Sequence, residues 1–485
     1  MFTKLKSTEM FADGKFAQVL LLSGCFMLIF TAFMTTCIIE QTVIDSVKKD
    51  DPSFTGDGYT SLAIIYAVFA IVAWISPSIV AILHAKKALF ISALFYLLFI
   101  VGFLYPRGWL LYLTSATIGA SAAILWTAQG NFLSLTSSPQ TISRNSGVFW
   151  GINQCSLFFG NIFVFWQFYG KTHIDADTRF VVFVVLSVVC FIGSLCFLFL
   201  KDLRAEPAAA AESDNESVGK RSNRRNPSGL TTAWNAMKES LKLAITPHML
   251  LLSVTSLYTG LEQCFYSGVY ASSIGFTNAF GGDAKRLVGL VGILIGVGEV
   301  TGGGLFGLLG PVTTKKGQTP IIALGLFTHI TCFVLVYLNL PNGAPLGATD
   351  EVSYFTEPYV SVAILCAFLL GFGDACFQTQ LISMFASGYK EKSSAAFAIF
   401  KFIQSAGSAG AFFASSYMGL YLQLGILVIM CALGSVLFAF VEWQIKKRKG
   451  LEDSLKASKE DSDGDAPLAG DSLTVEVDEN SKSSL

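Results

Sequence analysis

Charged side chains are scarce in this sequence: Asp, Glu, Lys and Arg together make up only 14% of its 485 residues. Soluble globular domains carry about 25% charged residues, so a composition this poor in charge excludes an ordinary soluble domain. Hydrophobic residues account for 53% of the chain, and the mean hydropathy is +0.58. This balance indicates a membrane protein that crosses the bilayer several times.

Motifs for catalysis and metal binding are also missing. The sequence contains no Walker A motif, no metal-ligand cluster and no nucleophile–base spacing, and its four histidines are scattered. The stretch "GVGEVTGGG" at 296–304 lies inside an apolar run and follows no strand, so it does not indicate a nucleotide loop. We expect no enzyme activity, metal ion, cofactor or nucleic-acid partner. The ten cysteines fall in apolar runs, which favours buried thiols over a disulfide framework.

The apolar runs predict the membrane topology. A helix needs about 20 mostly apolar residues to cross the bilayer core. The first run is longer than the apolar core of a signal peptide, so it predicts a spanning helix and not a cleaved leader. Twelve runs are long enough: 17–39, 59–83, 87–104, 108–132, 145–169, 179–200, 248–275, 286–310, 318–340, 358–387, 392–416 and 419–443.

The segments between these runs predict the domain organisation. Lys and Arg concentrate in the loops that lie on the same side as both termini, which predicts that both termini are cytoplasmic. The polar connection between spans six and seven lacks apolar periodicity and predicts a largely disordered linker. The predicted order is a cytoplasmic N-terminus (1–16), a six-helix bundle (17–200), the linker (201–246), a second six-helix bundle (247–444) and a disordered cytoplasmic tail (445–485).

Short internal matches relate the two bundles. The sequence "LLLS" opens the first span at 20–23 and the seventh at 250–253, and the pattern Gly-x3-Ala-x3-Thr occurs at 119–127 and 371–379. Together with the central linker, these matches favour a duplicated six-helix unit. We therefore expect an all-α membrane protein with the major facilitator fold.

Four ionisable residues lie near the predicted membrane midplane. They are Glu262, Glu299, Asp374 and Lys401, in spans seven, eight, ten and eleven. Each charge at a helix centre costs about 2.5–3.5 kcal/mol on insertion scales, so these side chains are expected to face the bundle interior and to pair. In the major facilitator fold these four spans line the central cavity, whereas spans nine and twelve face lipid.

Pairing of these residues has two interpretations. Spans ten and eleven are joined by a short loop, which predicts an ion pair between Asp374 and Lys401. Glu262 and Glu299 then lack a basic partner, and two carboxylates in one low-dielectric cavity repel, so at least one should hold a proton or bind a cation. The four residues thus form either a coupling-ion site or a buried polar lock between helices.

The N-terminal bundle offers a neutral wall to the same cavity. Its candidate polar residues are Tyr66, Gln129, Asn131, Asn153 and Gln154. Amides in a helix bundle also serve simply as hydrogen-bond partners between helices, which is the alternative interpretation.

Several stretches resemble one known family. They are "GYTSLAIIYAVF" (58–69), "LWTAQGN" (125–131), "RNSGVFW" (144–150), "SLFFGN" (156–161), "YTGLE" (258–262), "LLGFGD" (369–374) and "AFAIFKFIQS" (396–405). In this order they resemble the Unc-ninety-three-like, or "uncoordinated", branch of the major facilitator superfamily over about 17–444. The resemblance implies the twelve-helix fold and a place among transporter-like proteins, some of which are regarded as regulators of potassium channels or escorts of membrane receptors. Arg144, at the cytoplasmic mouth of span five, lies in a matching stretch and is a gate candidate.

One departure from typical carriers bears on function. The loop between spans two and three, "IVAILHAKKALFI" (79–91), lacks the Gly, Asp and Arg that normally latch the two halves. Two functions therefore stay open. The first is a secondary transporter of an unknown small solute, coupled to protons or a monovalent cation. The alternative is a non-transporting regulator or escort of a channel or receptor. The membrane, plasma membrane or endomembrane, is not resolved by the sequence.

Overall fold

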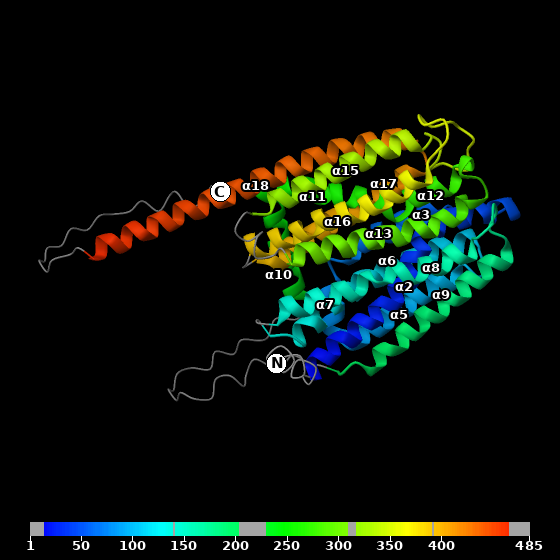
Figure 1. Cartoon of the computed structure of the whole chain (residues 1–485). Helices are drawn as coiled ribbons and strands as arrows, with labels where there is room; N and C mark the ends of the chain where they lie inside the picture. Colours follow the sequence, from blue (N-terminus) through cyan, green and yellow to red (C-terminus); the bar gives the residue numbers. More distant parts are fainter. Residues whose placement is uncertain (1–13, 139–140, 203–228, 309–316, 390–391, 465–485) are drawn as a thin grey trace, which may run out of the picture.

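The computed structural model describes residues 14–138, 141–202, 229–308, 317–389 and 392–464. Within these ranges the chain is helical, apart from turns, loops and one isolated bridge between Thr277 and Thr349. Figure 1 shows the helices packed side by side in one elongated bundle.

The helices fall into two sets that follow the chain. The first set is α2 (Gly14–Asp50), α3 (Gly58–Val72), α4 (Ser76–Leu83), α5 (Ala85–Gly102), α6 (Gly108–Leu135), α7 (Ile142–Gln154), α8 (Ser156–Gln167), α9 (Ala176–Cys196) and the turn η1 (Phe197–Phe199). The second is α10 (Gly229–Ala244), α11 (Pro247–Cys264), η2 (Phe265–Val269), α12 (Tyr270–Phe276), η3 (Asn278–Asp283), α13 (Ala284–Leu308), α15 (Thr319–Asn339), α16 (Val360–Gly388), α17 (Ser393–Ser415) and α18 (Leu420–Gly464). At their boundary α8 packs on α13, and α3 packs on α17.

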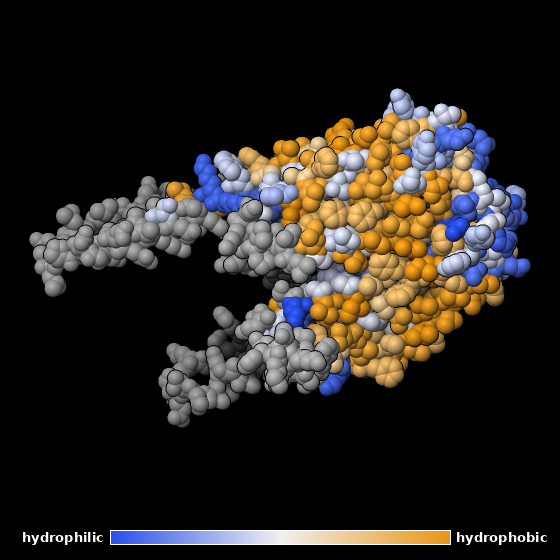
Figure 2. All heavy atoms as spheres, viewed as in Figure 1, coloured by the Kyte–Doolittle hydropathy of each residue, from blue (hydrophilic) through white to orange (hydrophobic). Residues whose placement is uncertain are grey.

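Apolar side chains cover the sides of the bundle. Figure 2 shows a broad hydrophobic band across the middle of the molecule, with hydrophilic residues gathered toward its ends. Ten helices of the described ranges are long and apolar enough to cross a membrane, and the count rises to twelve if each of two bent pairs forms one span. The predicted multi-pass membrane character is therefore confirmed, and the twelve predicted spans correspond to the upper count.

Both bent spans break beside a proline. Helices α3 and α4 are bent by 74°, and Pro77 in the first turn of α4 cannot donate a helical hydrogen bond. Helix α10 and the helix that begins at Pro247 are bent by 91°, so α10 lies across the direction of the spans. The connection from α4 to α5 is the single residue His84, whose φ of 63° is left-handed.

The two described ends of the chain lie at the same end of the bundle. In Figure 1, α2 begins and α18 leaves at this end, which we call the termini face. The opposite end, where α2 ends at Asp50 and α3 begins at Gly58, we call the loop face.

Two helices extend beyond the predicted bounds. Helix α2 continues past the predicted end at residue 39 as far as Asp50. Helix α18 continues to Gly464, so the first part of the tail expected to be disordered is helical. In the predicted linker, residues 203–228 lie outside the described residues and Gly229–Ala244 forms α10.

The two sets of helices are joined by hydrogen bonds at the loop face. Ser416 donates its hydroxyl to Asp57 Oδ1 at 2.8 Å, and Tyr59 donates its hydroxyl to the carbonyl oxygen of Pro345 at 3.1 Å. We call these two contacts the seam. Each bond links a residue at the start of α3 to a loop of the second set, so the seam holds the two halves together at this face.

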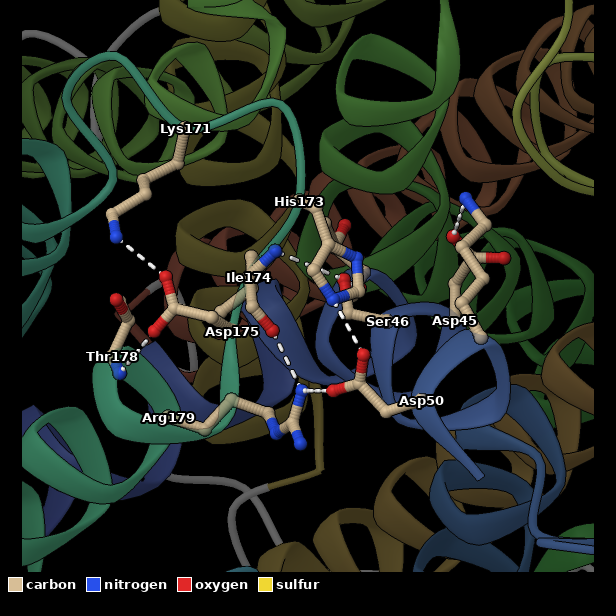
Figure 3. Close-up of polar contacts among 11 residues, drawn as sticks. Asp45, Ser46, Asp50, Lys171, His173, Ile174, Asp175, Thr178 and Arg179 are labelled. Atoms are coloured by element: carbon tan, nitrogen blue, oxygen red, sulfur yellow. Dashed lines mark hydrogen bonds and ion pairs between the residues drawn. The ribbon is translucent and has the colours of Figure 1, made fainter. Parts of the chain in front are cut away.

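A polar cluster ties the α8–α9 connection to the end of α2 (Figure 3). Asp50 binds Arg179 through Oδ2 at 2.5 Å and His173 through Oδ1 at 2.7 Å. Arg179 also donates to the carbonyl oxygen of Ile174 at 2.6 Å. The arginine charge is thereby shared between a carboxylate and a backbone carbonyl, which fixes the first turn of α9.

Asp175 caps the N-terminus of α9. Its Oδ1 accepts from the backbone N–H of Thr178 at 2.8 Å, and its Oδ2 pairs with Lys171 at 2.5 Å. The Lys171 ammonium and the Thr178 amide hold the pKa of Asp175 below its usual range. Because the folded pKa is lowered, this stabilisation is present above the unfolded pKa of about 3.9 and is lost as the pH falls through the folded pKa.

We expect Asp175→Ala to lower the free energy of unfolding by about 1 kcal/mol, because α9 loses its N-cap. Asp175→Asn should cost less, since Asn also caps, and its remaining difference from the wild type should shrink below about pH 4. Unfolding of the purified protein in detergent measures both effects. Glu357→Ala, at an exposed acid of the loop face, is the control. An equal cost from Glu357→Ala would contradict the capping role.

Candidate functional site

Three acidic side chains converge from three helices of the second set. Glu262 lies on α11, Glu299 on α13 and Asp374 on α16, and their exposed fractions are 0%, 6% and 6%. The carboxyl groups of Glu262 and Asp374 are in side-chain contact, and Glu299 acts on Asp374 electrostatically. We call these three residues the acid cluster. They form one buried group and do not point separately toward lipid.

The contact between Glu262 and Asp374 constrains their protons. In the described part of the chain, neither carboxyl oxygen of Glu262 accepts a hydrogen bond from an N–H or hydroxyl group. Two ionised carboxylates in contact inside an apolar bundle repel strongly, because interior charges are weakly screened. The contact becomes favourable when the two groups share one proton, since a protonated carboxyl donates to its neighbour.

His329 of α15 lies directly beside the acid cluster. Its Nε2 is 3.5 Å from Glu262 Oε1 and 3.2 Å from the carbonyl oxygen of Leu370, and its Nδ1 is 2.5 Å from the Tyr258 hydroxyl. Because a carbonyl oxygen can only accept, we assign the ring proton to Nε2, and Nδ1 then accepts from Tyr258. The tyrosine and the neutral imidazole thus form a fully buried hydrogen-bonded chain that ends at the carbonyl oxygen of Leu370, with Glu262 beside the imidazole.

The predicted ion pair between Asp374 and Lys401 is not formed in this structure. Among the described residues no ion-pair contact of 4.0 Å or less joins them. Lys401 donates to Gln404 Oε1 at 2.9 Å, and Asp374 accepts from Gln378 at 3.3 Å. The reason is the packing: α16 lies mainly against α13 and α15, and α17 lies mainly against α3 and α11. Helices α16 and α17, which follow each other in the sequence, are therefore not each other's main packing partners.

Glycines allow α13 and α16 to approach closely. A Cβ at Gly371 would overlap the carbonyl oxygen of Ile295, and a Cβ at Gly298 would overlap the carbonyl oxygen of Phe368. Small residues in membrane helices permit such backbone contact. This approach brings Glu299 within electrostatic range of Asp374.

The helix that carries Glu262 changes its geometry just after this residue. Helix α11 passes into η2, a π-helical turn, before continuing as α12. Single π-turns inside α-helices occur frequently at functional sites. The turn buries Tyr266 close to all three acids. Tyr66 of the first set stacks on Phe412 of α17, with ring centroids 5.7 Å apart, and lies beside Ser267 of the same turn.

The four amides predicted on the neutral wall are spread along the first set. Gln129 and Asn153 are buried, Gln154 is half-buried and Asn131 is exposed. The Oδ1 atom of Asn153 has no hydrogen-bond partner within the described ranges. Within these ranges none of the four amide side chains forms a hydrogen bond with the acid cluster. Of the residues predicted on the neutral wall, only Tyr66 lies beside the π-helical turn.

Arg144, the predicted gate residue, lies at the start of α7 on the termini face. Its guanidinium lies 4.7 Å from the centroid of the Phe16 ring and donates to Asn145 Oδ1 at 3.1 Å. Both partners belong to the first set of helices. In this structure Arg144 therefore joins α7 to α2.

A hollow of about 350 Å³ opens between α11 and α17. It is lined by Leu257, Leu261, Phe402, Ile403, Ala406, Gly407, Gly410 and Ala411. This lining is apolar and does not include the acid cluster, which is packed among its neighbouring side chains instead.

Sequence reasoning missed two parts of this arrangement. His329 is one of four histidines scattered along the sequence, which do not form a motif, although a single histidine in an apolar run is a signal. Glu40 lies one residue beyond the predicted end of the first span at residue 39, whereas α2 continues to Asp50 and Glu40 is completely buried. The π-helical turn left no signal in the sequence that we could interpret.

Comparison with known proteins identifies close sequence relatives. The model of the family described as "Ion channel regulatory protein UNC-93" matches residues 53–439. UNC93-like protein MFSD11 of Xenopus laevis is 43% identical over 436 residues, which cover 90% of this chain and 97% of that protein. Protein unc-93 homolog A of Homo sapiens is 24% identical over 471 residues, covering 89% and 94%. The resemblance predicted from the quoted stretches, which extends to major facilitator superfamily domain-containing protein eleven, is confirmed.

Comparison with solved structures identifies the fold. The nucleoside transporter NupG superposes with a TM-score of 0.58 at 13% identity, over 88% of this chain and 99% of that chain. The peptide transporter POT superposes with a TM-score of 0.60 at 13% identity, over 87% and 94%. At this identity the likeness concerns the fold alone, and it supports the major facilitator arrangement of helices.

We expect Gly371→Ala to lower the free energy of unfolding by about 1–3 kcal/mol, because the new methyl group overlaps Ile295 and separates α13 from α16. Denaturant unfolding of the purified protein in detergent measures this cost. Gly303→Ala is the matched control on α13, since a Cβ there meets nothing within 4 Å. Equal effects of the two substitutions would contradict the close helix contact.

We expect Tyr258→Phe to cost about 1–3 kcal/mol, because it leaves Nδ1 of His329 buried without a donor. The same unfolding measurement detects the loss. Tyr417→Phe removes a hydroxyl from an exposed side chain and should change stability little. If Tyr258→Phe also leaves stability unchanged, the assigned tyrosine–histidine hydrogen bond is wrong.

Proposed function

Because this chain belongs to the UNC-93 family and has the major facilitator fold, we propose that it is a secondary transporter of a small solute, coupled to protons through the acid cluster. The observation that carries the proposal is the convergence of Glu262, Glu299 and Asp374 in one buried group. Buried carboxyl groups that share protons can load and release them, which is what a coupling site requires.

Lys401 supplies a counter-charge in the proposed cycle. When the shared proton leaves, Glu262 and Asp374 repel each other, and Lys401 is the lysine that acts electrostatically on Asp374. Its ammonium group is held by Gln404 in the structure. In the proposed deprotonated state it turns toward Asp374 and forms the ion pair that the sequence predicts. Such an exchange of partners is a two-state element that a transport cycle can use.

The N-terminal half contributes the solute side of the proposed site. Tyr66 and the amides Gln129, Asn131, Asn153 and Gln154 are neutral hydrogen-bonding groups, which suit a polar solute. The printed names of NupG and POT describe carriers of nucleosides and peptides, and both solute classes are candidates to be tried. We place both termini in the cytoplasm on the distribution of Lys and Arg, with Arg144 at the cytoplasmic mouth.

A second function is favoured by a separate observation. The matching family is described as ion channel regulatory, and the α4–α5 connection, which latches the halves of typical carriers, is reduced here to His84. These features support a non-transporting regulator of a channel or receptor. In that function the acid cluster is a buried polar lock between α11, α13 and α16.

Reconstituted vesicles distinguish the two functions. With a mixture of nucleosides, dipeptides, amino acids and sugars outside, an inward proton gradient should drive uptake of at least one solute, detected by mass spectrometry. Glu262→Gln and Asp374→Asn should each reduce gradient-driven uptake by about tenfold or more, because each removes a carboxyl group that exchanges the proton. Glu357→Gln at the exposed loop face is the matched control and should leave uptake unchanged.

Other outcomes would argue against transport. If the wild type moves no solute and co-purifies with a channel, the regulatory function replaces the transporter. If the Gln and Asn variants lose their folded state in detergent, the polar lock is the better description of the acid cluster.

A further inference from the structure

Glu40 is a completely buried carboxyl group outside the acid cluster. It lies on α2 in the first set of helices, its exposed fraction is 0%, and neither of its oxygens has a hydrogen-bond partner in the described part of the chain. The buried hydroxyls of Thr35 and Thr42 on the same helix also lack partners there. A polar group buried in this way is rare in folded proteins and calls for a physical reason.

The side chains around Glu40 offer it no positive charge. Ser61 of α3 lies beside it, but Ser61 Oγ is 2.8 Å from Ser115 Oγ. The Ser115 hydroxyl donates to the carbonyl oxygen of Leu111 at 2.6 Å, so the Ser61 proton is directed to Ser115.

The titratable groups that act on Glu40 come from three elements. They are Cys37 of α2, Asp57 at the N-cap of α3 and Tyr112 of α6. None of the three is basic. An ionised Glu40 would therefore carry most of the desolvation cost of a buried carboxylate, several kcal/mol, because none of these titratable neighbours is a cation that could offset it.

We propose that Glu40 is a proton-binding site of the N-terminal half, occupied when the loop face is closed. A buried acid without a cation becomes neutral by taking up a proton. A hard metal cation would need about six oxygen ligands, and no group of three or more His, Cys, Asp or Glu side chains that could hold a metal is found among the described residues. A proton needs one acceptor, and a protonated Glu40 donates to Ser61.

The neighbour of Glu40 in the chain connects this proton to the seam. Gln41 Oε1 accepts from the backbone N–H groups of Gly58 and Tyr59 at 2.9 and 3.3 Å, and its Nε2 donates to Asp57 at 3.4 Å. Asp57 and Tyr59 are the residues that bond across the seam. Loss of the proton places a second negative charge near Asp57 and weakens closure of this face. The proposal needs no transported solute and is independent of the proposed function.

Infrared spectroscopy of the purified protein in detergent tests the proposal. At neutral pH, the difference between the wild type and Glu40→Gln should contain the C=O stretching band of one protonated carboxyl group. Glu442→Gln is the matched control, because Glu442 is bound as a carboxylate by the amides of Gln318 and Thr319 and by Lys446. Its difference spectrum should contain a carboxylate band instead. If the difference spectrum between the wild type and Glu40→Gln instead shows the loss of a carboxylate band, the proposal is overturned.

Two further measurements keep the test decisive if Glu40→Gln folds poorly. The triple variant Glu262→Gln, Glu299→Gln, Asp374→Asn lacks the acid cluster and should still contain a protonated carboxyl band, whose absence overturns the proposal. Thermal unfolding of the same triple variant should give a melting temperature that falls as the pH rises, since unfolding frees Glu40 to ionise. If the melting temperature of this variant is instead higher in Na⁺ than in N-methylglucamine, the site binds a metal cation and the proposal is overturned as well.

Discussion

The cost of placing a carboxylate in an apolar helix bundle is the constraint on which the rest of the structure depends. At the loop face, where water is near, Asp50 binds Arg179, and Asp175 caps α9 and pairs with Lys171. Inside the bundle, Glu262 and Asp374 have mainly each other. Acidic residues therefore serve as fixed structural anions at the loop face, and we propose that they hold protons inside the bundle.

The interior acids are brought together by backbone packing and not by attraction between their charges. Gly298 and Gly371 let α13 and α16 touch through their main chains, and the π-helical turn after Glu262 adds a local change in α11. The neutral His329, held by Tyr258 and Leu370, fills the remaining side. Rigid packing of this kind keeps like charges near each other, as a site that exchanges protons requires.

The two halves differ in how they use buried polarity. The second set of helices gathers three acids and one lysine around Asp374. The first set holds Glu40 alone, beneath the residues that form the seam. The two sets of helices thus have unlike polar interiors. Under the two proposals, closure of the loop face and the state of the acid cluster respond to protons separately.

Local sequence patterns were enough to predict the membrane class, the helical fold, the family and the burial of Glu262, Glu299 and Asp374, because lipid strongly constrains apolar runs and rare charges. They did not determine which of these side chains meet. The Asp374–Lys401 pair followed from chain adjacency and is replaced by Glu262–Asp374 and Lys401–Gln404, because α16 packs on α13 and α15, and α17 packs on α3 and α11. The positions of His329 beside Glu262 and of Glu40 of α2 in the interior of the bundle emerged with the tertiary structure, because burial and contact depend on residues far apart in the chain.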